Sequence, residues 1–99
     1  MFEQLTFYRR QWIAGKGLLQ ATKKYGPYEL SVIKEPNKQY YEIAILDTKG
    51  LFVRLPGIHK DYFDDDEHED VVISGLNKRD ISVIMKKLEL ITLKEGTRV

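Results

Sequence analysis

A dense run of acidic residues is the first feature of the chain with the chemistry to form a site. Seven carboxylates lie within the ten residues from Asp61 to Asp70, in the stretch "DYFDDDEHEDVV". An EF-hand loop would need a glycine at its sixth position and a glutamate at its twelfth. Counting from Asp64, the chain has Glu69 and Gly75 at those two positions. The spacing therefore argues against a calcium loop, and we expect no specific metal site.

The same run has the charge to bind a partner protein with a basic surface. Closely spaced carboxylates can attract such a surface, and aromatic residues beside them are frequent interface anchors. A block of like charges is also typical of a solvated loop, and the sequence leaves both interpretations open. In the binding interpretation, the acidic loop at residues 59–70 contacts the partner through Tyr62, Phe63, Asp64, Asp65, Asp66, Glu67 and Glu69.

A second candidate site is the basic and aromatic stretch "TFYRRQW" near the start of the chain. Arginine beside aromatic rings is used both by single-stranded nucleic-acid binders and by protein interfaces. The alternative is that Phe7 and Trp12 belong to the core while the arginines reach solvent, and the near-zero net charge favours this alternative. The candidate nucleic-acid-binding residues are Arg9, Arg10, Trp12, Lys23 and Lys24.

Residue types and spacing give little support to catalysis. The chain has no cysteine, and "AGKGLL" lacks the spacing of a phosphate-binding loop. Three serines, Ser31, Ser74 and Ser82, have only His59 and His68 as bases, and none lies in a nucleophile elbow. We therefore expect a non-enzymatic protein without a cofactor.

Composition and charge place the chain among small globular proteins. Its 99 residues suit one domain, and 42% hydrophobic with 31% charged residues is ordinary globular usage. Residues 1–40 carry a net charge of +4, residues 61–70 carry −7 and residues 71–99 carry +3, although the total is +1. No apolar stretch approaches the roughly 20 residues that span a bilayer, and no signal peptide is evident. We expect a soluble cytoplasmic protein with locally segregated charge.

The elements that position these residues begin with a C-terminal helix. Asn77 is a good N-cap, Asp80 lies three residues later, and Leu76 can pack against Ile81. Apolar residues recur with helical spacing at 81, 84, 85 and 88. The pattern predicts a helix from about Lys78 to Leu90, followed by a frayed tail at residues 92–99.

Upstream, the stretch from Pro27 to Leu55 predicts an antiparallel meander. Turn residues separate apolar, β-branched runs at 28–34, 40–47 and 51–55, and "GLLQATKKYGPY" can add a strand before them. In the middle run, Glu42, Ala44 and Leu46 share a half-polar face that we expect to be partly covered. The first 14 residues fit two patterns: Phe2, Leu5, Trp12 and Ile13 suit a helical face, whereas the alternation of Leu5 and Phe7 with Thr6 and Tyr8 suits a strand. Of the two, we favour a short helix that stops at Gly15. Together these elements predict an α+β fold in which three or four strands pack against the C-terminal helix.

The order "YELSVI", "YYEIAILDTKG" and "EDVVISGLNKRDISVIMKKL" resembles a class of very small proteins from tailed-phage and prophage genomes. The likeness covers about residues 25 to 91. Leu76, Asn77, Asp80 and Ile81 match the opening of the terminal helix in that class, and 41–46 match its strand. The resemblance implies a viral origin and an accessory role.

Three functional hypotheses follow. The first is an accessory protein that binds a host macromolecule with a basic surface and inhibits a defence or nucleic-acid enzyme. The second is a nucleic-acid-binding module that uses the basic and aromatic N-terminal segment. The third is a homo-oligomer that sequesters small molecules at its subunit seams.

Overall fold

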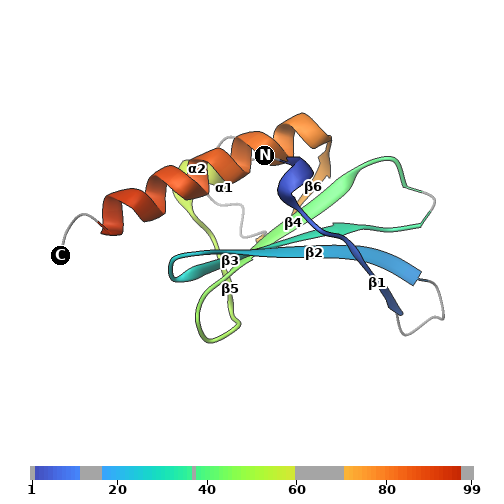
Figure 1. Cartoon of the computed structure of the whole chain (residues 1–99), viewed down its shortest axis with the longest axis horizontal. Helices are drawn as coiled ribbons and strands as arrows, with labels where there is room; N and C mark the ends of the chain where they lie inside the picture. The colour runs from blue at the N-terminus through green and yellow to red at the C-terminus, as the bar shows by residue number, and fades with distance from the viewer. Residues whose placement is uncertain (1, 12–16, 37, 60–70, 97–99) are drawn as a thin grey trace.

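The computed structural model describes residues 2–11, 17–36, 38–59 and 71–96 of the chain (Figure 1). The elements in chain order are η1 (Phe2–Gln4), β1 (Tyr8–Gln11), β2 (Gly17–Tyr25), β3 (Tyr28–Lys34), β4 (Tyr41–Leu46), β5 (Phe52–Val53), α1 (Pro56–His59), β6 (Ile73–Leu76) and α2 (Lys78–Gly96). The predicted α+β class is confirmed, with six described strands in the sheet rather than three or four.

The strands form one antiparallel sheet in the order β1-β2-β3-β4-β5. β5 and β6 share the remaining edge of β4: β5 pairs with Ile45 and Leu46, and β6 pairs with Tyr41 and Ile43. The meander follows directly from the chain because its strands are separated by short turns. At the tightest of these, Tyr25 pairs with Tyr28 across Gly26 and Pro27, and Gly26 has a φ of 57°.

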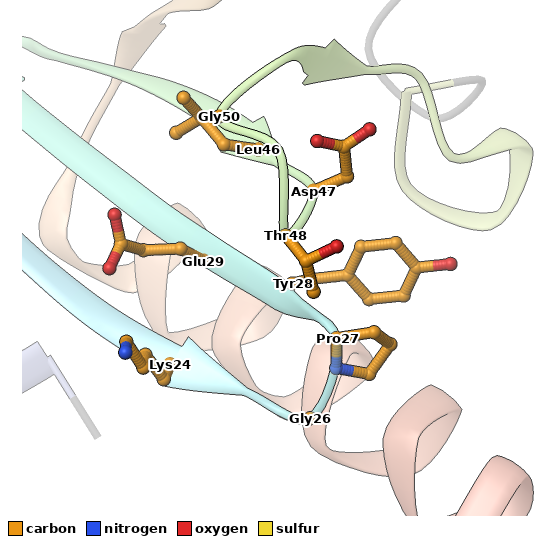
Figure 2. Close-up of a pocket in the computed structure, with 9 residues that line it drawn as sticks. All are labelled: Lys24, Gly26, Pro27, Tyr28, Glu29, Leu46, Asp47, Thr48 and Gly50. Carbon is orange, nitrogen blue, oxygen red and sulfur yellow. The ribbon is translucent and has the colours of Figure 1, made fainter.

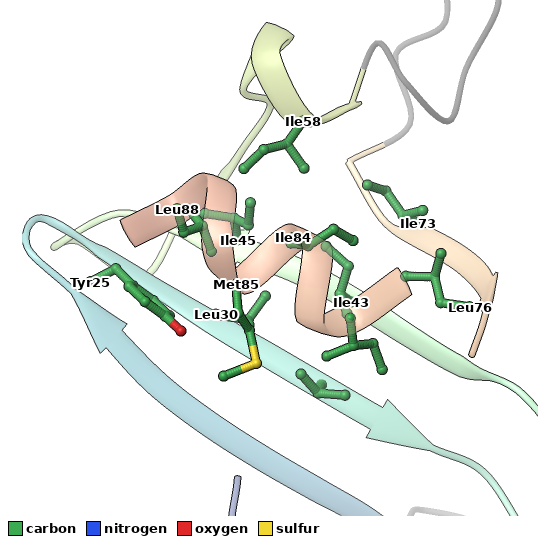
Figure 3. Close-up of a cluster of buried hydrophobic side chains, with 12 residues drawn as sticks. Tyr25, Leu30, Ile43, Ile45, Ile58, Ile73, Leu76, Ile84, Met85 and Leu88 are labelled. Carbon is green, nitrogen blue, oxygen red and sulfur yellow. The ribbon is translucent and has the colours of Figure 1, made fainter. Parts of the chain in front are cut away.

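α2 lies along one side of this sheet, and the core fills the space between them (Figures 1 and 3). The four helix residues with the predicted spacing, Ile81, Ile84, Met85 and Leu88, are fully buried. They belong to the same core cluster as residues of β3, β4, α1 and β6, namely Leu30, Val32, Ile43, Ile45, Ile58, Ile73 and Leu76. Burial of large aliphatic side chains, each contributing about 1.5–3 kcal/mol, is the main force that holds α2 on the sheet.

The start of α2 is capped as the sequence predicts. The Asp80 amide donates to Asn77 Oδ1 at 2.8 Å, and the Asn77 amide donates to Asp80 Oδ2 at 3.0 Å. The helix continues beyond the predicted end at Leu90, because Ile91 packs against the core and Thr92 lies close to the Gly26 turn. Residues 92–96 are therefore helical, and 97–99 lie outside the described residues. No helix in the described part of the chain is long and apolar enough to cross a membrane.

The N-terminal segment differs from the predicted helix. It has one 3-10 turn, η1, and then pairs along β2 as strand β1; residues 12–16 lie outside the described ranges. Phe2 and Phe7 pack on Tyr41 with ring centroids 5.2 and 5.8 Å away, and the Phe2 amide donates to Ser82 Oγ. These long-range contacts, which local helix propensity does not include, favour the extended path.

The connection from β5 to α2 also differs from the expected loop, because it contains α1 and β6. Ile73 and Leu76 of β6 are buried, with a register shift in the pairing to β4 and a φ of 72° at Gly75. The bulged register breaks the alternation of buried and exposed residues. That is why the strand was missed from sequence.

Candidate functional site

The pairing register divides the sheet residues between a covered face, which packs on α2, and an open face. Leu30 and Val32 of β3 belong to the core on the covered face, so Glu29, Ser31 and Ile33 alternate onto the open face. No helix of the described residues lies on that second side (Figure 1).

The open face has a hollow of about 380 Å³ over the middle of the sheet. Its floor is closed by Ser31 and Ala44, which are only 6% and 7% exposed. Phe52 and Val72 line it while remaining 57% and 41% exposed. The lining residues, here called the open-face hollow, are Gln20, Thr22, Glu29, Ser31, Ile33, Glu42, Ile43, Ala44, Leu46, Phe52 and Val72.

A hydrogen bond between two neighbouring strands crosses the polar side of this hollow. The Gln20 side-chain amide donates to Ser31 Oγ at 2.9 Å. Because Ser31 is buried, this bond supplies the partner that a buried hydroxyl requires. Gln20 and Ser31 therefore form a fixed polar strip beside the apolar surface of Ala44 and Phe52.

A second hollow of about 360 Å³, the turn hollow, lies where two turns meet at one end of the sheet (Figure 2). Figure 2 shows the hairpin turn at Pro27 on one side and the turn from Asp47 to Gly50 on the other. The second turn is held by Asp47 Oδ1, which accepts the amides of Lys49 and Leu51 at 2.8 and 3.0 Å. The turn hollow is lined by Lys24, Gly26, Pro27, Tyr28, Glu29, Leu46, Asp47, Thr48 and Gly50.

The two hollows share Glu29 and Leu46 in their walls and are rimmed mainly by negative charge. Among the described residues that line them, the charged groups are three carboxylates, those of Glu29, Glu42 and Asp47, and one ammonium, that of Lys24. Lys24 is directly opposite Glu29 in the β2–β3 register. This leaves a net charge of −2 around an apolar surface, which favours a basic ligand and disfavours a polyanion.

The carboxylate of Glu35, the residue after the end of β3, is already paired with a lysine. Its Oε2 lies 2.9 Å from Lys38 Nζ. The pKa of Lys38 is raised, chiefly by its hydrogen bond with Glu35 and by the charge of that group, and more weakly by the charge of Glu42. Glu35 is therefore a control for Glu42: both side chains are negatively charged, but Glu42 lines the open-face hollow and Glu35 is paired with Lys38.

The acidic-loop residues predicted from sequence, Tyr62 to Glu69, lie outside the described residues. His59, placed at the start of that loop by the sequence, is instead the last residue of α1 and is fully buried. The Leu55 amide donates to its Nδ1 at 3.0 Å, and its Nε2 lies 3.1 Å from the carbonyl oxygen of Val71. His59 thus joins the two chain segments that flank the acidic run.

The N-terminal candidates do not form one described basic patch. Arg9 pairs with Leu19 on the covered-face side of the sheet, whereas Lys24 lines the turn hollow. Lys23 is on the same side of the sheet as Arg9. It lies four residues along β2 from Leu19, the pairing partner of Arg9, which corresponds to roughly 13 Å between Lys23 and Leu19. Arg10 belongs to β1, but its side chain lies outside the described part of the structure, as does the whole of Trp12.

Sequence reasoning missed the open-face hollow as a site. The usable signal was the half-polar face of β4, on which Glu42, Ala44 and Leu46 alternate with core residues. That signal predicted partial cover, but the contributions of Gln20, Phe52 and Val72 depend on strand pairing across the sheet. Within the described ranges, no three His, Asp or Glu side chains are grouped so that they could hold a metal ion.

Comparison with known proteins gives no relative on which an assignment could rest. No protein-family model matches the chain, and neither the curated proteins nor the solved structures include a significant match.

Proposed function

We propose that this protein is a non-enzymatic accessory protein that binds another protein, with the open-face hollow as its main contact surface. The observation that carries the proposal is an apolar hollow, rimmed by carboxylates, on the side of the sheet opposite α2. Exposed apolar surface bordered by polar groups is typical of interaction sites. Phe52, more than half exposed at the rim, has the size and rigidity of an interface anchor.

The acidic run supports the same surface through its position in the chain. Val72 lines the open-face hollow and follows Asp70, the last residue of the run, by two positions. The run therefore ends two residues before a residue of the hollow in the sequence, and its seven carboxylates have the same sign of charge as the rim of the hollow. Complementary charge of this kind accelerates encounter with a basic partner and excludes acidic ones.

The partner class that we propose is a host protein with a basic surface, contacted in the host cytoplasm. The resemblance to small phage proteins supports a host target, and enzymes that bind nucleic acid have basic surfaces that suit a negative hollow. Occupation of such a surface would inhibit the enzyme by competition with its nucleic acid.

The proposal is tested by capturing host proteins on the immobilised chain and on two single variants. Phe52→Ser removes the exposed ring at the hollow, and Val83→Ser is the matched control because Val83 is also exposed but lies on α2. We expect Phe52→Ser to lose the captured partner while Val83→Ser retains it. Melting temperatures of both variants establish that they are folded.

A third variant separates the hollow from the acidic loop. It replaces Asp64, Asp65, Asp66, Glu67 and Glu69 with serine. We expect weaker capture with little change in melting temperature, because the charge contributes mainly to encounter. Equal capture by the wild type, Phe52→Ser and the loop variant would reject the proposed function.

A further inference from the structure

We infer that the occupant of the open-face hollow is a basic amphipathic helix of the partner protein. This inference rests on the proposed function and specifies the partner's chemistry.

The backbone pairing argues against an added strand. The hollow is lined by residues of β2, β3, β4 and β5, and the ladders between these strands run beneath it. An extended peptide adds to a sheet through the free backbone groups of an edge strand. Over the middle of the hollow, β3 and β4 are paired on both sides and have no free edge, so an occupant there makes its contacts through side chains.

The layer architecture of the sheet suits a helix on the open face. The opposite face of the same sheet already packs a helix, α2, through apolar residues spaced at i, i+3, i+4 and i+7. A second helix on the open face would complete a helix–sheet–helix arrangement, which is a standard way to bury both faces of a sheet. Its apolar stripe would lie over Ala44 and against Phe52 and Val72.

The charge of the rim specifies the flanks of that helix. Glu42 and Glu29 lie along the open-face hollow and Asp47 lies at the adjoining turn hollow, and Lys24 is the one basic group among their described lining residues. Lysine or arginine on both sides of the apolar stripe would pair with these carboxylates, whereas glutamate there would be repelled. The same rim repels nucleic-acid phosphates, so a strand of DNA or RNA is the less favoured occupant.

The test uses defined probes with the full chain. One fluorescent peptide has leucine at helical i, i+3, i+4 and i+7 positions and lysine elsewhere; its counterpart has glutamate in place of lysine. We expect the leucine–lysine peptide to bind at least about tenfold more tightly than the leucine–glutamate peptide, measured by anisotropy. Equal affinity for the two peptides would overturn the inference.

Matched variants locate the binding. Phe52→Ser should weaken the leucine–lysine peptide at least about fivefold, whereas Val83→Ser should not. Glu42→Gln should weaken it about two- to fivefold, whereas Glu35→Gln, which removes an equal charge already paired with Lys38, should have less effect. Binding that survives Phe52→Ser but disappears when the acidic loop is neutralised would place the peptide on the loop and reject the hollow.

Two further outcomes identify other occupants. Tighter binding of a single-stranded oligonucleotide than of the leucine–lysine peptide, lost in Phe52→Ser, would assign the hollow to nucleic acid. Concentration-dependent dimerisation that Phe52→Ser abolishes would assign it to a second copy of the chain. Either result would overturn the inference.

The two proposals can fail separately. If Phe52→Ser loses the captured host protein but neither peptide binds the wild type, the binding function stands and only the helical occupant is rejected. If Phe52→Ser changes neither capture nor peptide binding, both are rejected.

Discussion

At the scale of single residues, Tyr25 combines deep burial with an unpaired hydroxyl. Its side chain is 7% exposed, and its hydroxyl has no hydrogen-bond partner among the described residues. The ring lies under Lys23, whose Nζ is 5.7 Å from the ring centroid. Burial raises the pKa of the Tyr25 phenol, and the negative charge of Glu89 raises it further.

This raised pKa predicts an alkaline loss of stability that depends on Tyr25. The folded state favours the neutral phenol, so its contribution is fully present below the unfolded pKa of about 10 and is lost as pH rises through the folded pKa. We expect Tyr25→Phe, which keeps the ring beside Lys23, to lose less unfolding free energy than the wild type above about pH 10. Near neutral pH it should be equally or more stable, because an unpaired buried hydroxyl is removed.

Denaturant unfolding across this pH range measures the difference. Tyr8→Phe makes the same chemical change at an exposed ring and is the matched control. Identical alkaline slopes for the wild type and Tyr25→Phe would show that the phenol is not responsible.

At the scale of elements, the reciprocal cap of α2 joins β6 to the helix that closes the core. Each of Asn77 and Asp80 accepts the other's backbone amide, and the buried residues Leu76 and Ile81 flank this pair on either side. The carboxylate of Asp80 also lies in the first turn, where it interacts favourably with the helix dipole. The cap therefore sets where α2 begins and how the chain enters it.

Asn77→Ala should lower the free energy of unfolding by about 1 kcal/mol, because the Asp80 amide loses its acceptor. Lys86→Ala, at an exposed position within α2, is the control and should change stability by less than about 0.5 kcal/mol. Urea unfolding of the two variants gives the comparison. An Asn77→Ala loss no larger than that of Lys86→Ala would mean that the cap contributes little.

At the scale of the whole molecule, charge is segregated although the total is only +1. The negative rim of the two hollows and the divided basic residues work against binding of a polyanion. Arg9 and Lys23 are far apart on one side of the sheet, and Lys24 lines a hollow on the other. Counterion release, which drives nucleic-acid affinity, requires several cations that contact phosphates together.

We therefore expect no retention of a single-stranded oligonucleotide at moderate salt, about 0.15 M. Anisotropy of a labelled oligonucleotide at low and moderate salt measures this. Tight binding with a steep salt dependence, weakened by substitution of Arg9 or Lys23, would instead support the nucleic-acid hypothesis for the N-terminal segment.

Local patterns were sufficient to predict several elements. The first residue of α2, its cap and its four core residues follow from short-range spacing, and β3 has the predicted bounds of Tyr28 and Lys34. The predicted N-terminal helix was wrong over Tyr8–Gln11, because pairing with β2 and contacts between Phe2, Phe7 and Tyr41 override local preference. β6 was missed for a related reason, since only its pairing with β4 explains the burial of its residues.

The sequence by itself determined the α+β class, the capped helix and the core stripe, because helix and strand periodicities are properties of neighbouring residues. Only the tertiary structure decided the open-face hollow and the place of His59. Gln20, Ser31, Ala44, Phe52 and Val72 are spread over more than half of the chain and become neighbours through the pairing of separate strands. His59 binds the carbonyl of Val71 across twelve positions of sequence, so its role depends on how the chain returns to the sheet.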